Sequence, residues 1–149
     1  MKNVLACLIA VFLVSGNAGA SQADEGFIMT AGGLSYKDLR VGSGPAAQPG
    51  DIAVVHLVGW IDDDGPRGKP IYDSRTQEQR PVSFVVGSDK VMRGWSEGVT
   101  GMRARGTRLV RIPPQLGYGD KGVENLVPPR AQLLFTLELL EVRPPANRE

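Results

Sequence analysis

The chain has 149 residues, a single cysteine and almost balanced charge, with 17 Lys and Arg against 16 Asp and Glu. This length predicts one compact domain, because it is too short for a cofactor domain joined to a substrate domain. A formal net charge of +1 provides no strong field to attract nucleic acid or anionic lipid, so we expect no nucleic-acid partner.

The first twenty residues have the pattern of a secretory signal. Lys2 precedes an apolar run at 4–14, and the small residues Ala-Gly-Ala follow at 18–20. The alternative is a membrane anchor, but the run is shorter than the roughly 20 residues that span a bilayer. We therefore expect residues 1–20 to be a cleaved signal peptide and the mature protein to be periplasmic or secreted, without membrane attachment. Cleavage also removes Cys7, which leaves neither a disulfide nor a thiol nucleophile.

A polar lead and several strand-like segments come next. Residues 21–33 contain glycine and polar residues without sustained periodicity, so we expect a flexible lead there. From Leu34 the composition predicts, in order, a strand at 34–41, a glycine- and proline-rich turn at 42–50, a strand at 51–61, an Asp-Asp-Asp-Gly-Pro turn at 62–66 and a short strand leading to Tyr72-Asp73.

One short helix is predicted at 91–99, where Met92, Trp95 and Val99 fall on one face. Gly94 and Gly98 each weaken this helix by up to about 1 kcal/mol relative to alanine, so we expect packing to hold it and the glycines to permit a close neighbour. The remaining expected segments are a strand at 82–86, a strand at 107–112, an 18-residue loop at 113–130, a final strand from Leu133 with alternating apolar residues, and a polar tail at 144–149.

The order of these elements indicates the fold class. Several strands and one helix without strand-helix alternation predict an α+β domain over residues 34–143, with the helix on the apolar face of an antiparallel sheet.

The common catalytic and metal-binding sets are not supported. His56 is the only histidine, so a His/Cys zinc site is excluded, and no nucleophile-elbow sequence accompanies it. An EF-hand loop beginning at Asp62 needs Gly and Glu at the positions of Arg67 and Asp73. The Gly-Ser-Gly-Pro run at 42–45 lacks the Gly-Lys-Ser/Thr of a phosphate loop. We therefore expect neither a metal nor a cofactor.

Five blocks of sequence carry the most specific information. They are Val54-Val55-His56, Tyr72-Asp73-Ser74, the segment at 91–99 with its Arg-Gly-Trp-Ser-Glu-Gly core, Leu116-Gly117-Tyr118-Gly119, and Val127-Pro128-Pro129-Arg130-Ala131. In order and spacing, these blocks resemble the signature of the FKBP-type peptidyl-prolyl cis-trans isomerases, over a match from about Gly50 to Val142. The resemblance implies a twisted antiparallel sheet wrapped around one short helix, and a proline-sized apolar pocket whose floor is the indole of Trp95.

The resemblance also implies a role for individual residues. The catalytic positions are Asp73, Met92 and Tyr118: the Tyr118 hydroxyl and the Met92 backbone N–H donate to substrate carbonyls, and Asp73 lies at the rim. The substrate-binding positions are Tyr72, Phe84, Val91, Trp95, Leu126, Val127 and Phe135, together with Leu57 and Val82. The implied partners are proline-containing polypeptides and macrolide inhibitors of the tacrolimus and rapamycin type.

The chain departs from the family pattern at three of these surrounding positions. Leu57 stands where a tyrosine is common, Glu78 where an arginine is common, and Val82 where a phenylalanine often closes one wall. We expect Asp73 to be less constrained and the pocket to be wider as a result. These departures support an alternative, a catalytically weak chaperone or proline-segment binding module on the same fold. No long helical pattern precedes the domain, so we expect a monomer.

Overall fold

The computed structural model of the protein describes residues 26–63 and 67–145. The expected signal peptide, the first part of the expected lead, the Asp-Gly-Pro end of the turn at 62–66 and most of the polar tail lie outside the described residues. In the described part of the chain, no helix is long and apolar enough to cross a membrane.

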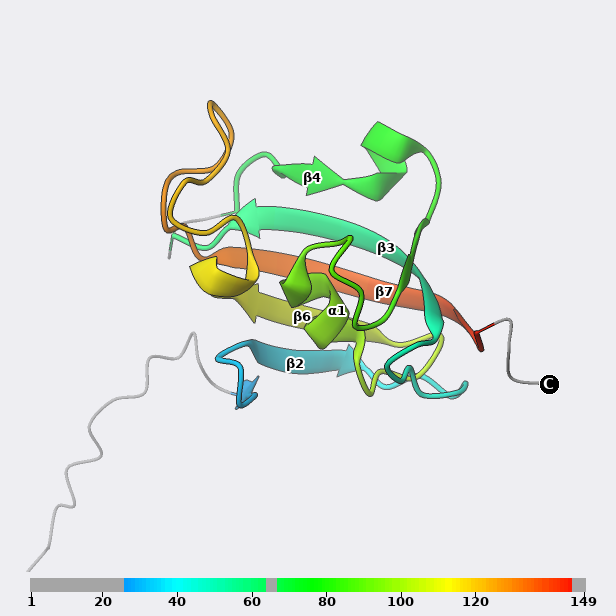
Figure 1. Ribbon diagram of the computed structural model, residues 1–149. Helices are drawn as coiled ribbons and strands as arrows, with labels where there is room; N and C mark the ends of the chain where they lie inside the picture. Colours follow the sequence, from blue (N-terminus) through cyan, green and yellow to red (C-terminus); the bar gives the residue numbers. More distant parts are fainter. Residues whose placement is uncertain (1–25, 64–66, 146–149) are drawn as a thin grey trace, which may run out of the picture.

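The described residues form one antiparallel sheet and one short α-helix (Figure 1). The strands run in the order β1-β2-β6-β7-β3-β4, and β5 also pairs with β3. Their bounds are β1 Ile28–Met29, β2 Ser35–Arg40, β3 Ile52–Ile61, β4 Tyr72–Asp73, β5 Val82–Val85, β6 Thr107–Ile112 and β7 Leu133–Arg143. The helix α1 spans Arg93–Val99, one π-helical turn η2 spans Ser74–Glu78, and a 3-10 turn η3 spans Pro114–Leu116.

The two long central strands β3 and β7 supply most of the core. Leu133, Phe135, Leu137 and Leu139 have no exposed surface, whereas Thr136 and Glu138 between them are half-buried. Alternate residues of a strand point to opposite faces of the sheet, so β7 presents one apolar face to α1. The expected apolar alternation of the final strand is confirmed.

The helix lies against the face formed by β6 and β7 (Figure 1). A Cβ atom at Gly94 would lie 2.4 Å from Ile112 Cγ2, and one at Gly98 would lie 2.8 Å from Leu137 Cδ1. Glycine therefore lets the helix backbone approach the sheet more closely than any other residue allows. The expected close approach at the two glycines is confirmed, and packing against the sheet compensates for their low helix propensity.

A buried arginine ties the end of this helix to the sheet. Arg108 of β6 donates its Nη1 to the carbonyl oxygens of Gly98 at 3.1 Å and Thr100 at 3.3 Å. Its Nε pairs with Asp38 of β2 at 2.6 Å, and its guanidinium stacks over the ring of Tyr36 at 4.0 Å. Arg108 thereby supplies donors to helix-end carbonyls that have no partner within the helix.

Two segments expected to be irregular contain short structure. Within the expected lead, Ile28 and Met29 form β1, which pairs with Tyr36 and Ser35 of β2. Two residues are too few for a periodic pattern, so only pairing to β2 specifies this strand. The expected loop at 113–130 contains η3 and an isolated bridge between Val123 and Val127.

Candidate active site

Three aromatic rings from three different elements meet above the helix. The ring centroid of Trp95, on α1, lies 5.5 Å from that of Tyr72 on β4 and 5.6 Å from that of Phe135 on β7. The Tyr72 ring is tilted by 43°, and the Phe135 ring meets the indole edge-on at 70°. Such tilted and edge-on contacts are the favoured geometries for aromatic pairs, so the indole is held on two sides.

A glycine on the neighbouring strand makes room for this cluster. Gly59 of β3 is the cross-strand partner of Phe135. A Cβ atom at Gly59 would lie 2.3 Å from Phe135 Cε1, so the ring occupies the space of a missing side chain. Gly59 therefore lets the Phe135 ring lie close to β3. In this position the ring contacts the indole of Trp95.

The start of α1 provides a backbone donor beside the indole. Met92 is the N-cap, with non-helical φ of −52° and ψ of 126°. Its carbonyl accepts from the N–H of Trp95 at 3.0 Å and of Ser96 at 3.4 Å. The N–H of an N-cap residue has no partner within its own helix, so the Met92 amide is able to donate to a ligand carbonyl.

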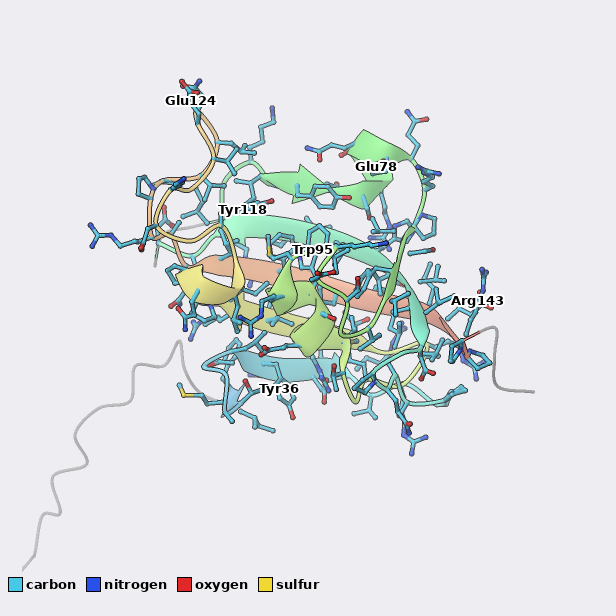
Figure 2. All side chains as sticks on the ribbon, viewed as in Figure 1. Tyr36, Glu78, Trp95, Tyr118, Glu124 and Arg143 are labelled. Atoms are coloured by element: carbon cyan, nitrogen blue, oxygen red, sulfur yellow. The ribbon has the colours of Figure 1, made fainter. Side chains whose placement is uncertain are left out.

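Two tyrosines, Tyr72 and Tyr118, are half-buried and pack against the core. Burial raises the pKa of Tyr118 above 10.0. Burial is also the main reason that the pKa of Tyr72 is raised, followed by the charge of Glu78 and then by Tyr118 and Asp73. Both hydroxyls therefore stay protonated at neutral pH and act as hydrogen-bond donors. Figure 2 shows Trp95 between the loop that carries Tyr118 and the turn that carries Glu78.

Asp73 is held by its own turn. It is the N-cap of η2, and its Oδ1 accepts the backbone N–H of Arg75 at 2.9 Å. The next residue, Ser74, is fully buried; its Oγ accepts the N–H of Leu57 at 3.0 Å and lies 2.9 Å from His56 Nδ1. The turn therefore holds the Asp73 carboxylate through its own backbone, and the expectation that Asp73 is less constrained than in the family pattern stays a prediction.

The other sequence-predicted residues lie at different depths. Tyr72, Val82, Val91, Met92, Trp95 and Tyr118 are half-buried and pack against the core. Phe84 and Val127 are 6% and 4% exposed, whereas Leu126 is 47% exposed. Leu57 and Phe135 have no exposed surface, so they shape the site from beneath and meet a ligand only if their neighbours move.

Two hollows include residues predicted for the site, and one of them is lined by a ring of the aromatic cluster, Tyr72. A groove of about 580 Å³ follows the loop after Tyr118 and includes Leu126 and Val127; its other lining residues are Ile61, Lys121, Val123, Glu124, Asn125, Pro128 and Pro129. A second cavity of about 300 Å³ is lined by Tyr72, Glu78, Arg80, Pro81, Val82 and Ser83.

Sequence reasoning missed some of these lining residues. It did not identify Val123, Lys121 or Arg80 as part of the site's surroundings. The length of the loop at 113–130 was the available signal, because long loops in compact domains often carry binding residues. Within the described residues, no three His, Cys, Asp or Glu side chains are grouped so that they could hold a metal ion.

Comparisons with known proteins agree with this geometry. The family model described as "FKBP-type peptidyl-prolyl cis-trans isomerase" matches residues 44–140. An FK506-binding protein of Neisseria meningitidis serogroup B is 38% identical over 111 residues, which cover 74% of this chain and 97% of that protein. The peptidyl-prolyl cis-trans isomerase FPR2 of Saccharomyces cerevisiae is 37% identical over 97 residues, covering 65% of this chain and 69% of that protein.

Solved structures show the same fold. The crystal structure of FkpA from Escherichia coli matches with a TM-score of 0.69 and 36% identity, over 80% of this chain and 53% of that chain. The chain thus corresponds to about half of FkpA. The crystal structure of AtFKBP13 matches with a TM-score of 0.69 and 33% identity, over 77% of this chain and 97% of that chain.

Proposed function

The chain belongs to the FKBP-type peptidyl-prolyl cis-trans isomerase family and accelerates rotation about X-Pro bonds, and we propose that it does so at the aromatic cluster around Trp95. The observation that carries this proposal is the half-buried indole of Trp95, which contacts the rings of Tyr72 and Phe135.

The reaction needs an environment rather than a nucleophile. An X-Pro amide resists rotation by about 18–20 kcal/mol, because its C–N bond has partial double-bond character. The planar amide is the more dipolar form, so an apolar site that strips water from the bond disfavours this form relative to the twisted one. We propose that the proline ring lies over the Trp95 indole, where little water reaches the amide.

Three polar groups then orient the substrate. The Met92 N–H and the Tyr118 hydroxyl donate to carbonyl oxygens of the peptide, and the Asp73 carboxylate stands at the rim near the rotating carbonyl. None of these groups transfers a proton. Because Tyr118 stays protonated at neutral pH, its hydroxyl remains a donor throughout the physiological range.

The proposed substrates are proline-containing segments of exported proteins. The charge and apolar pattern of residues 1–20 supports export to the periplasm or the medium. The names of the relatives include FK506-binding proteins, so we also propose that a macrolide of this type binds over Trp95 and competes with the substrate. A monomer remains our expectation.

A Tyr118→Phe variant tests the donor role. Its kcat/KM for short Ala-Xaa-Pro-Phe peptides is expected to fall about threefold to tenfold, the value of one hydrogen bond. Urea unfolding of the same variant checks that the fold is intact. An unchanged kcat/KM in the folded variant contradicts the role of the hydroxyl.

A second candidate function is binding without useful catalysis. The exposed Leu126 and the groove of about 580 Å³ beside it favour this candidate, because they offer apolar surface beyond the aromatic cluster. The departures from the family pattern at Leu57, Glu78 and Val82 also favour binding without efficient catalysis. A folded protein that prevents aggregation of an unfolded client but leaves every proline peptide at its uncatalysed rate supports this candidate instead.

A further inference from the structure

The turn η2, which follows Tyr72 and Asp73, carries one charged side chain in an ion pair and another without one in the described part of the chain. The Arg75 guanidinium pairs with Glu138 of β7, which neutralises it. Within the described part of the chain, Glu78 makes no ion pair, and it lies on the exposed end of η2. The Glu78 carboxylate is therefore a charge that remains available to a ligand.

The charge of Glu78 affects Tyr72, which belongs to the aromatic cluster. After burial, its charge is the largest cause of the raised pKa of Tyr72, and Asp73 adds to the same effect. The ring of Tyr72 is also the one that packs 5.5 Å from Trp95. The negative field of Glu78 thus reaches the rim of the site, and Figure 2 shows Glu78 on the turn above Trp95.

A cavity connects Glu78 with that rim. The hollow of about 300 Å³ is lined by both Tyr72 and Glu78, with Pro81 and Val82 on its apolar side. The small Val82 side chain leaves this space open. An extended side chain lying on Tyr72 and Val82 would place its end beside the Glu78 carboxylate.

We propose that Glu78 is a specificity-determining residue, which favours substrates with a lysine or arginine next to the isomerised proline. The proposal rests on the isomerase function proposed above. Lysine and arginine suit the cavity, because their methylene stems cover apolar surface while their charged heads stay in water. Asp73 adds a second negative charge at the rim. Arg80 also lines the cavity and opposes this selection, which makes it a matched control of opposite charge.

The test compares peptides that differ only in the charge beside proline. Peptides of the form Ala-Xaa-Pro-Yaa carry Lys, Gln or Glu at Xaa in one series and at Yaa in another, and exchange NMR gives kcat/KM for each. At low salt, kcat/KM is expected to be greater for Lys than for Glu by about threefold to tenfold on at least one side of proline, as for an exposed charge pair. This ratio should fall towards one at about 1 M salt, where the Debye length is about 3 Å.

Two variants assign the preference to Glu78. Glu78→Gln should bring the Lys/Glu ratio close to one, and E78R should invert it, whereas Arg80→Gln should increase it. All values are ratios to the Gln peptide, so a general change in activity cancels. Urea unfolding establishes that each variant is folded, and the salt dependence of the natural protein remains a test if a variant is not.

Two results overturn the proposal. One is equal kcat/KM for the Lys and Glu peptides at low salt while the Gln peptide is clearly accelerated. The other is a Lys/Glu ratio that stays unchanged in folded Glu78→Gln. If no peptide is accelerated at all, the isomerase function itself is contradicted. In that case a direct binding titration tests the charge preference separately, and equal affinities of the protein for the Lys and Glu peptides overturn it.

Discussion

At the scale of single residues, the site depends on large side chains that fit against glycines on neighbouring elements. Gly59 leaves the space that the Phe135 ring fills, and Gly94 lets α1 sit against Ile112. The indole of Trp95 is held by these contacts. Its Nε1 is buried without an acceptor among the described residues, so hydrogen bonding does not fix the ring.

The signature blocks identified Trp95 and Tyr118, but the sequence did not reveal that Gly59 supports Phe135, because that contact joins β3 to β7.

Gly59→Ala tests this support. The added Cβ would lie 2.3 Å from Phe135 Cε1, and overpacking of this kind costs about 1–3 kcal/mol of the free energy of unfolding. Gly68→Ala is the control, because a Cβ at Gly68 meets nothing within 4 Å. Urea unfolding of both variants measures the difference, and equal stabilities would contradict the account of Phe135.

The two half-buried tyrosines of the site, Tyr72 and Tyr118, predict a loss of stability at alkaline pH. The pKa values of Tyr72 and Tyr118 are raised above 10.0 in the folded protein. Folding therefore favours the neutral hydroxyls. Their contribution is fully present below the unfolded pKa of about 10 and is lost as pH rises through the folded pKa. Between about pH 8 and about pH 11, the free energy of unfolding measured in urea should fall less in Tyr118→Phe than in the natural protein. An identical pH dependence would contradict the burial effect on Tyr118.

At the scale of elements, the turn after β4 is fixed from several directions. Its first residue, Asp73, caps it, and Ser74 bonds to β3. Arg75 then links η2 to β7 through Glu138. Strands β6 and β7 and the helix were predictable, because their apolar periodicity is strong and local. Strand β1 and the details of η2 and η3 were not, because they depend on pairing and capping contacts rather than on a repeating pattern.

The Arg75–Glu138 pair should couple η2 to the sheet. The two side chains are 49% and 30% exposed, so their interaction is expected to contribute about 0.5–1 kcal/mol in a double-mutant cycle with alanine, and less at high salt. The Arg93–Glu97 pair, at 3.7 Å and with Arg93 70% exposed, is a weaker matched control. A coupling energy no greater than that of the control would show that Arg75 does not anchor the turn.

At the scale of the whole molecule, the sheet brings together residues that are far apart in the chain. Tyr72 comes from β4, Trp95 from α1, Tyr118 from the loop after η3, and Phe135 from β7. The α+β class and the antiparallel sheet around one helix were predictable, since the element order and the signature blocks both indicate them. The two hollows beside the cluster were not, because their shapes depend on how the loop at 113–130 and η2 fold over the sheet.

The two tryptophans provide the most direct test of where catalysis occurs. Trp95 lies in the aromatic cluster, whereas Trp60 stacks beneath Arg67 at 5.2 Å. Trp60 follows Gly59 on β3, so its side chain points to the opposite face of the sheet. The two residues are thus a matched pair on different faces of one domain.

The measurement is kcat/KM for an Ala-Xaa-Pro-Phe peptide in Trp95→Leu and Trp60→Leu, with urea unfolding of both variants as the check on folding. Trp95→Leu is expected to reduce kcat/KM by about tenfold or more, equivalent to about 1.4 kcal/mol of transition-state stabilisation, whereas Trp60→Leu is expected to keep a value close to that of the natural protein. Equal activity in the two folded variants would contradict the placement of the active site at Trp95.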